Sequence, residues 1–482
     1  MKFLKKILNK TNNMLEPVRA SFWFTICSII NKCIQLITIP IFTRLLTTKE
    51  YGEYSIFVSW QSIIIIFATL NLYSNVFNNG MLKYKNDREG FLSALQGLTS
   101  TISLFIIGVF IILNDIIADY IGLPTYILII MMIEIMLMPG YEFWSASERF
   151  EYRYKKIIKV TLLIAVLNPI IGFIFVHFAN HKGHARILSV LIVQIIIYGY
   201  LYIRNFVNSK KFYDRRYWKY ALFLAVPLVP HYLSQILLNQ MDRIMISNIC
   251  GIDKAGIYSV AYSAAMVLQI VGKAIQSSFT PWIYKKIDSG NINQIKPTVN
   301  VLVFIVAVLN FLFICMAPEV IMILGGEKYK QAIYIIPPLI SSCYLIFIYS
   351  IFCIIEFYYE KNRAMTVVSV CGALTNYIMN FVFIRMFGYY AAGYTTLLSY
   401  IFFVVAHFFV MKKALTDNSI NDNIFDMKFI SIFTVIFIIS SVTVTFIYDY
   451  YLLRYCLLVL TIVFCLMKKK NLRELASIRS GK

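Results

Sequence analysis

The sequence predicts an all-α polytopic membrane protein with about 14 transmembrane helices. Of the 482 residues, 59% are hydrophobic and 14% are charged, whereas soluble proteins carry about 25% charged residues. Long apolar runs recur along the chain, and each is long enough to cross a hydrocarbon core about 30 Å thick as a helix. Because backbone N–H and C=O groups find no water in lipid, these runs are expected to be helices.

The predicted spans follow one another with short connections. They cover residues 20–43, 54–77, 92–113, 124–146, 158–178, 186–204, 221–246, 256–281, 298–318, 332–357, 364–385, 391–411, 429–447 and 450–467. Most Lys and Arg residues fall in alternate connections, which the positive-inside rule assigns to the cytoplasm. Both termini are therefore predicted to be cytoplasmic.

The net charge of +21 follows from this asymmetry, and the expected partner is anionic membrane lipid rather than nucleic acid. The nine cysteines include no Cys-x-x-Cys pair. They are interpreted as small core residues, so no metal site is predicted. The same interpretation applies to His177, His181 and His184 beside an outer loop, because no Cys or acidic residue lies close to them in sequence.

Two segments that resemble each other indicate a repeat. TTKEYGEYSIF (47–57) and IDKAGIYSVAY (252–262) share Gly-x-Tyr-Ser, and their glycines, Gly52 and Gly256, lie 204 positions apart. At the same offset, polar residues of the first span fall on polar residues of the seventh. Six spans separate the two copies, so both enter the membrane from the same side and form a parallel repeat.

The repeat predicts two six-helix lobes around a central cavity, with two extra C-terminal helices. The predicted parts are a cytoplasmic basic N-terminus (1–19), an N-lobe of spans one to six (20–204), a cytoplasmic linker (205–220), a C-lobe of spans seven to twelve (221–411), spans thirteen and fourteen (412–467) and a cytoplasmic basic tail (468–482).

RLLTTKEYGEYSIF (44–57) resembles the first loop of the polysaccharide transporter family, the Wzx-type flippases of the multidrug/oligosaccharidyl-lipid/polysaccharide exporter superfamily. Residues 239–262, 319–332 and 376–400 resemble later segments of that family, in the same order. The resemblance implies movement of a polyprenyl-pyrophosphate-linked oligosaccharide to the outer leaflet of a bacterial cell (inner) membrane. The exported polymer would be an O-antigen, a capsule or another polysaccharide, with other polysaccharide-assembly proteins as partners.

Three spans carry a narrow polar stripe on an apolar body, as a water-filled cavity requires. The stripe residues predicted to bind substrate are Asn31, Lys32, Gln35, His231, Gln235, Asn239, Gln269, Lys273 and Gln276. Lys32 and Lys273 would bind the pyrophosphate, and the amides would bind sugar hydroxyls. The alternative for the amides is hydrogen bonding between helices that only holds the bundle together.

Charged residues inside spans are candidates for coupling transport to an ion gradient. Asp242 and Glu134 are predicted to hold H+ or Na+, and no other cofactor is expected because the chain has no phosphate-binding Gly-x-x-x-x-Gly-Lys-Ser/Thr loop. Arg243 is a further substrate-binding candidate. It projects about 100° from Asp242, and pairing with an acid such as Glu134 is the alternative. Glu142 and Glu356 rank lower, because they lie at cytoplasmic helix ends beside basic loops.

Arg44, Glu50, Gly52 and Gly256 are predicted gate or loop residues, with Gly52 allowing a tight turn before the second span and the charged residues gating or capping helices. Two other functions stay open. A drug/cation antiporter of the same superfamily would favour an acidic cavity, whereas Lys32 and Lys273 favour an anion. A membrane-embedded glycan polymerase would usually need a large outer loop, and this chain has neither that loop nor an Asp-x-Asp motif.

Overall fold

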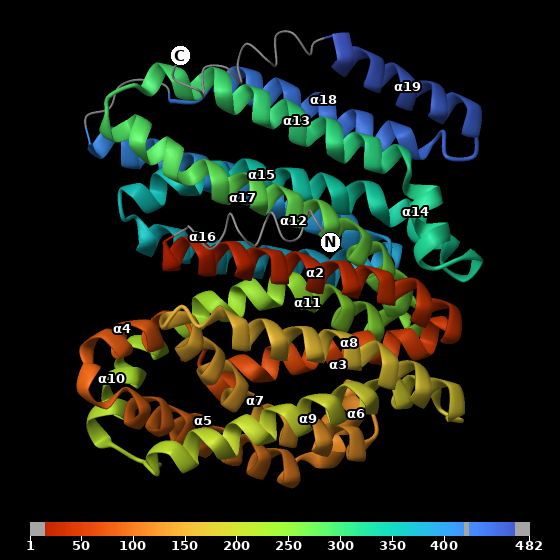
Figure 1. Cartoon of the computed structure of the whole chain (residues 1–482). Helices are drawn as coiled ribbons and strands as arrows, with labels where there is room; N and C mark the ends of the chain where they lie inside the picture. Colours follow the sequence, from red (N-terminus) through yellow and green to blue (C-terminus); the bar gives the residue numbers. More distant parts are fainter. Residues whose placement is uncertain (1–14, 419–423, 468–482) are drawn as a thin grey trace, which may run out of the picture. The chain divides into compact units, whose positions relative to one another are not determined.

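The computed structural model describes residues 15–418 and 424–467, and all regular structure in these ranges is helical (Figure 1). In the described residues, twelve helices are long and apolar enough to span a membrane, which confirms the all-α polytopic prediction. Residues 1–14 of the predicted N-terminus and the predicted tail 468–482 lie outside the described residues.

The chain divides into two compact units, Met1–Gln240 and Met241–Lys482, with the boundary inside α11 (Val229–Cys250). The first unit holds α2 (Glu16–Leu45), α3 (Thr48–Thr69), α4 (Asn75–Lys83), η1 (Lys85–Asp87), α5 (Arg88–Ile112), α6 (Asn114–Ile121), α7 (Thr125–Phe150), α8 (Tyr154–Phe178), α9 (Lys182–Ser209), α10 (Arg215–Ala225), η2 (Val226–Leu228) and the start of α11. The assignment of lobes to 20–204 and 221–411 stays a prediction.

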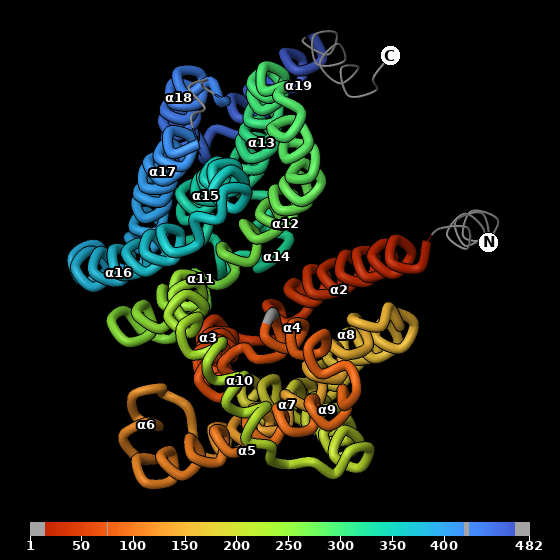
Figure 2. Tube along the Cα trace, turned by 90° about the vertical axis from the view of Figure 1, so that its left-hand side faces the viewer, coloured from red at the N-terminus to blue at the C-terminus, as the bar shows by residue number. Residues whose placement is uncertain are grey.

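The second unit holds the rest of α11 and the remaining helices. These are α12 (Ile252–Asp288), η3 (Ile292–Gln294), α13 (Ile295–Cys315), α14 (Ala317–Leu324), η4 (Glu327–Ile335), α15 (Ile336–Tyr358), α16 (Asn362–Phe387), α17 (Ala391–Asp417), α18 (Met427–Thr445) and α19 (Tyr451–Met467). Within this unit α15 packs against α12 and α17, and α17 also packs against α16 (Figure 2). These neighbours bring together the polar side chains described below.

Two of the 14 predicted spans do not correspond to any of the twelve long apolar helices of the described residues. The helix α19 is apolar but has 17 residues, and α3 replaces only part of the predicted span 54–77. Leu70 and Asn71 adopt φ values of 48° and 51°, so α3 stops there and α4 begins at Asn75. The apolar residues on both sides of this break concealed it in the sequence, because left-handed residues are more often Gly or Asn than Leu.

The repeated segments begin their helices in the same register, but not through a turn at the predicted glycines. Gly52 and Gly256 are buried as the fifth residues of α3 and α12, so the prediction that Gly52 forms a tight turn is wrong. The positions before the helices differ. Thr47 caps α3 through a hydroxyl that accepts a hydrogen bond from Glu50 N, whereas Gly251 precedes α12 with a φ of 105°.

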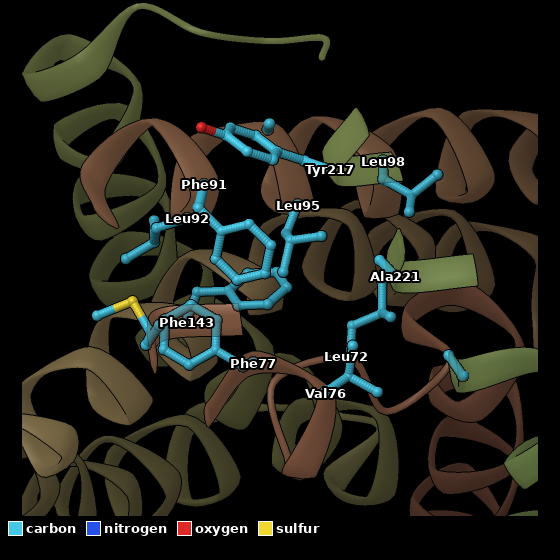
Figure 3. Packing of buried hydrophobic residues seen from close by; sticks show 13 residues of the cluster. Leu72, Val76, Phe77, Phe91, Leu92, Leu95, Leu98, Phe143, Tyr217 and Ala221 are labelled. Carbon is cyan, nitrogen blue, oxygen red and sulfur yellow. The ribbon is translucent and has the colours of Figure 1, made fainter. Parts of the chain in front are cut away.

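An aromatic core packs α4, α5, α7 and α10 of the first unit together (Figure 3). Phe77 of α4, Phe91 of α5, Phe143 of α7 and Tyr217 of α10 are all buried, and the rings of Phe77 and Phe143 lie 5.5 Å apart. The Tyr217 hydroxyl donates to Asp87 Oδ2 at 2.7 Å. The predicted linker 205–220 is thus largely helical and packs on α5.

An ion pair joins α19 to α14. Arg454, whose side chain is 4% exposed, donates from both terminal nitrogens to the Glu319 carboxylate at 2.5 Å. It also donates to the backbone oxygen of Cys315 at 2.9 Å. Arg454 thus anchors the last helix.

Candidate functional site

Asp242 is the centre of a buried polar cluster in the second unit. It is 1% exposed and lies in α11, where Asn239, Gln240 and Arg243 are its polar neighbours in the sequence. Its carboxylate accepts hydrogen bonds from Tyr258 Oη of α12 at 2.5 Å, Asn380 Nδ2 of α16 at 2.6 Å and Thr396 Oγ1 of α17 at 2.8 Å. Four helices therefore meet at one carboxylate.

A further layer of polar groups lies behind these donors. Asn380 Nδ2 also lies 3.2 Å from Asn376 Oδ1, and Thr395 Oγ1 donates to Asn380 Oδ1. Asn376, Asn380 and Thr395 are each no more than 2% exposed. We call Asp242, Tyr258, Asn376, Asn380, Thr395 and Thr396 the Asp242 cluster. It offers carboxylate, amide and hydroxyl oxygens, the donors that suit hard cations, within a few ångströms of one another.

Arg243 does not share the face of Asp242, as the helical angle predicts. Its guanidinium lies over the ring of Tyr262, 4.3 Å from the ring centroid, and the residue is 8% exposed. A cation over an aromatic face is stabilised by the ring quadrupole, so this contact accounts for a buried arginine. The alternatives of binding substrate and of pairing with Glu134 stay predictions.

Glu134 is a second buried carboxylate, in the first unit. It is 1% exposed in α7 and accepts a hydrogen bond from Gln61 Nε2 of α3 at 2.7 Å. A buried carboxylate whose donor is an uncharged amide is costly unless a proton or a cation neutralises it. The structure therefore keeps Glu134 as a coupling candidate.

The predicted stripe on α2 is present. Lys32 and Gln35 are exposed, and Lys32 Nζ donates to Gln35 Oε1 at 3.1 Å, so the two side chains lie on one face. Asn31 beside them is half-buried. The Lys32 ammonium retains two further N–H donors by its chemistry.

The stripe on α12 divides into exposed and packed parts. Lys273 is exposed, whereas Gln269 is 8% exposed. Gln276 Nε2 donates to the backbone oxygen of Ser350 in α15 at 3.3 Å. Gln276 thus makes the helix-to-helix contact that was the alternative for the stripe amides, and Lys273 is the accessible group.

The stripe on α11 lies in the first unit. His231, Gln235 and Asn239 are all half-buried, and Asn239 Nδ2 donates to Gln235 O of its own helix at 2.6 Å. His231 Nδ1 is buried without a hydrogen-bond partner among the described residues. These groups are partly accessible, and their binding of substrate stays a prediction.

The charged residues of the first loop act on helix ends. Glu50 Oε2 accepts from Thr47 N at 2.8 Å and from Thr47 Oγ1 at 2.9 Å, which completes a capping box at the start of α3. Arg44 donates to Pro40 O of α2 at 3.2 Å. Capping, one of the two predicted roles, is therefore present for Glu50.

Sequence reasoning missed several members of the sites. Tyr258, Asn380 and Thr396 contact Asp242 but were not singled out. An available signal was Asn376 and Asn380 one helical turn apart in an apolar span, since that spacing puts two amides on one face. Glu356 lies near the end of α15, as predicted, but its side chain is 0% exposed and pairs with His407 rather than with a basic loop.

Comparison with known proteins identifies the family. The family described as "Polysaccharide biosynthesis protein" matches residues 18–287, which is more than half of the chain. The chain belongs to the polysaccharide biosynthesis protein family. A Haemophilus influenzae protein named "Lsg locus putative protein 1" is 22% identical over 378 residues, covering 76% of this chain and 90% of that protein.

Solved structures of transporters share the fold of this family member. The lipid II flippase MurJ in an inward closed conformation has a TM-score of 0.67 at 15% identity, covering 93% of this chain and 99% of that chain. An inward-facing multidrug resistance MATE family transporter of the MOP superfamily has a TM-score of 0.65 at 11% identity, covering 84% and 100%. The polysaccharide family that the sequence indicated is therefore confirmed, and the chain has the fold of these solved structures. The twelve long apolar helices of the described residues support a multi-pass membrane protein.

Proposed function

We propose that this protein flips polyprenyl-pyrophosphate-linked oligosaccharide units from the cytoplasmic to the outer leaflet of a bacterial cell membrane. The observation that carries the proposal is the joint occurrence of a polysaccharide-biosynthesis family match and a flippase fold. The product would feed a cell-surface polysaccharide such as an O-antigen or a capsule. Both termini would lie in the cytoplasm, where other polysaccharide-assembly proteins are the expected partners.

The exposed lysines supply the chemistry that the head group needs. A pyrophosphate carries several negative charges, and the ammonium groups of Lys32 and Lys273 attract it as point charges. Gln35 and Asn31, on the same helix as Lys32, offer amide donors and acceptors to sugar hydroxyls. The polyprenyl tail would stay in lipid, because burying its carbons in a polar cavity would gain nothing.

The Asp242 cluster is proposed to couple flipping to an ion gradient. A proton at this carboxylate would neutralise the charge that Tyr258, Asn380 and Thr396 stabilise, and Na+ would offset it. The oxygens of Asp242, Asn380 and Thr395 fit a small hard cation. Glu134, whose donor is the uncharged Gln61, is the second candidate for the coupling ion.

The first experiment measures leaflet accessibility of a labelled polyprenyl-pyrophosphate oligosaccharide in vesicles containing the purified protein. Wild type should move the lipid, and Lys32→Ala and Lys273→Ala should each abolish movement. Lys49→Ala removes an exposed lysine from α3, outside the stripes, and should leave movement unchanged. Wild-type rates in both stripe variants would overturn the pyrophosphate site, and equal losses in all three would indicate a general effect of positive charge.

The coupling proposal has a separate test in the same vesicles. Flipping is measured with and without a proton or Na+ gradient in wild type, Asp242→Asn and Asp253→Asn. Asp253 is a matched control, because its carboxylate lies near the start of α12 and contacts Lys254 at 3.6 Å. Loss of gradient dependence in Asp242→Asn alone is expected. Unchanged dependence in that variant would remove Asp242 from the mechanism.

A drug/cation antiporter is the second candidate function. It is favoured by the buried carboxylates Asp242 and Glu134, which suit cationic substrates, and by the MATE-like fold. Gradient-driven uptake of a cationic dye into the same vesicles, with no movement of glycolipid, would support this function over flipping.

A further inference from the structure

A cysteine, a glutamate and a histidine converge inside the second unit, away from the Asp242 cluster. Cys353 and Glu356 lie three residues apart on α15, and His407 projects from α17, which packs beside it (Figure 1). Their exposed fractions are 6%, 0% and 2%. The sequence places His407 about 50 positions from the other two, which is why no metal motif is visible there.

The three side chains point at one another through ligand atoms. His407 Nδ1 lies 3.0 Å and 2.9 Å from the two Glu356 oxygens and 3.5 Å from Cys353 Sγ. All the potential ligand atoms lie within 4.8 Å of one another. In a tetrahedral zinc site with bonds of about 2.0 to 2.3 Å, neighbouring ligand atoms are about 3.3 to 3.6 Å apart. Small side-chain shifts would therefore fit Zn2+ between them.

Aromatic rings fix the imidazole in the orientation that such a site needs. The Tyr349 ring lies 5.3 Å from the His407 ring at 17°, and the Phe403 ring lies 5.8 Å from it at 24°. Stacking against both rings restricts rotation of the imidazole, which keeps Nδ1 directed at Glu356.

The charge balance also favours a cation. Glu356 is fully buried, and in the described part of the chain no Lys or Arg forms an ion pair with it. A buried carboxylate opposite a single imidazole is costly unless its charge is compensated. Sulfur and nitrogen ligands select a borderline-soft ion such as Zn2+ over Mg2+ or Ca2+.

We propose that Cys353, Glu356 and His407 form a structural Zn2+ site that clamps α15 to α17. The Cys353 thiolate and His407 Nδ1 supply two ligands, and the Glu356 carboxylate, which faces Nδ1 with both oxygens, completes the coordination as a bidentate ligand. This site is independent of the proposed flippase activity. Since zinc binding couples to folding, its removal should weaken the packing of the two helices.

The test uses the full chain, purified in lipid nanodiscs with an affinity tag that contains no histidine. Zinc content is measured by mass spectrometry after dialysis against Zn2+ and then against metal-free buffer. Co2+ binding is followed by the sulfur-to-cobalt absorption band in the near ultraviolet, which reports a cysteine ligand directly. Wild type is expected to retain close to one zinc ion per chain and to show the cobalt band.

Two cysteine variants separate this site from adventitious binding. Cys353→Ser should lose the cobalt band and most of the zinc, whereas Cys315→Ser, which changes another buried cysteine of the same unit, should keep both. Folded wild type that retains no zinc and shows no band would overturn the proposal and leave a hydrogen-bonded His407–Glu356 pair. Retention of the band in Cys353→Ser would overturn it too. If Cys353→Ser does not fold, the zinc content and cobalt band of wild type and of His407→Gln test the proposal instead.

Discussion

Replacing Tyr258 by Phe removes one hydrogen-bond donor from Asp242 and little else. The Tyr258 hydroxyl donates to Asp242 Oδ2 at 2.5 Å, and both residues are buried. A hydrogen bond to a charged group contributes about 1.5 to 3 kcal/mol. The bond stabilises the ionised, unoccupied carboxylate, and a bound proton or Na+ weakens it. Without the hydroxyl, the unoccupied site is less stable, so the coupling ion should bind more tightly.

The expected size follows from the lower bound. About 1.4 kcal/mol corresponds to a tenfold change in an equilibrium constant, so the ion concentration that gives half-maximal flipping should fall about tenfold in Tyr258→Phe. Glycolipid flipping in vesicles, measured against the concentration of the coupling ion, gives this value. Tyr389→Phe is the control, because Tyr389 Oη donates at 2.7 Å to the uncharged Gln331 amide of the same unit. A half-maximal concentration that is unchanged or higher in Tyr258→Phe would refute the reasoning.

Three further substitutions test contacts that stabilise the fold, and each is measured by thermal unfolding in detergent. Thr47→Ala removes the capping box of α3 and should lower the free energy of unfolding by about 1 kcal/mol. Gly140→Ala should destabilise by about 1 to 3 kcal/mol, because a Cβ there would lie 2.6 Å from Tyr202 Cα. Burial raises the pKa of Glu319, but hydrogen bonds from Arg454 outweigh it, so the pKa lies below its ordinary 4.5. Glu319→Gln should therefore cost about 2 kcal/mol at neutral pH, and less as the pH falls through that lowered pKa.

Each of these measurements has an outcome that contradicts its premise. An unchanged melting temperature in Thr47→Ala would mean that the capping box adds nothing to α3. Wild-type stability of Gly140→Ala would mean that α7 and α9 can separate without loss. A cost of Glu319→Gln that is the same at acid and neutral pH would mean that the loss does not come from the carboxylate charge.

The membrane spans were predictable because a chain that crosses lipid can adopt few backbone conformations. Apolar runs must satisfy their backbone hydrogen bonds internally, so the sequence alone identifies α5, α7 and α13 as helices. The break after α3 was not predictable, because it begins at Leu70, a residue type that rarely adopts the left-handed conformation. The short helix α4 escaped for another reason, since most of it lies beyond the predicted span 54–77 in a segment with three Asn, a Gly and a Lys.

In the sequence, the charge of Asp242 points to the centre of the Asp242 cluster, but it does not point to the uncharged residues around it. Asp242 stands out because a carboxylate inside a span is rare and costly. Asn380 and Thr396 do not, because uncharged polar residues are common in membrane helices and most only bond their own turn or a neighbouring helix. Which of them faces Asp242 depends on the rotation of α16 and α17, and distant packing contacts set that rotation. The contact between Cys353 and His407 was unpredictable for the same reason, because it depends on the rotation of α15 and α17.

The length of α12 has a consequence for how the protein sits in a bilayer. This helix has 37 residues, so at 1.5 Å per residue it measures about 55 Å, while a bilayer with its head groups is about 40 to 45 Å thick. Unless it tilts steeply, α12 must emerge on at least one side. Its last turn carries Lys285 and Lys286. These two lysines would then lie at or beyond the phosphate layer of the membrane. Their charges would limit how far α12 can move along the membrane normal.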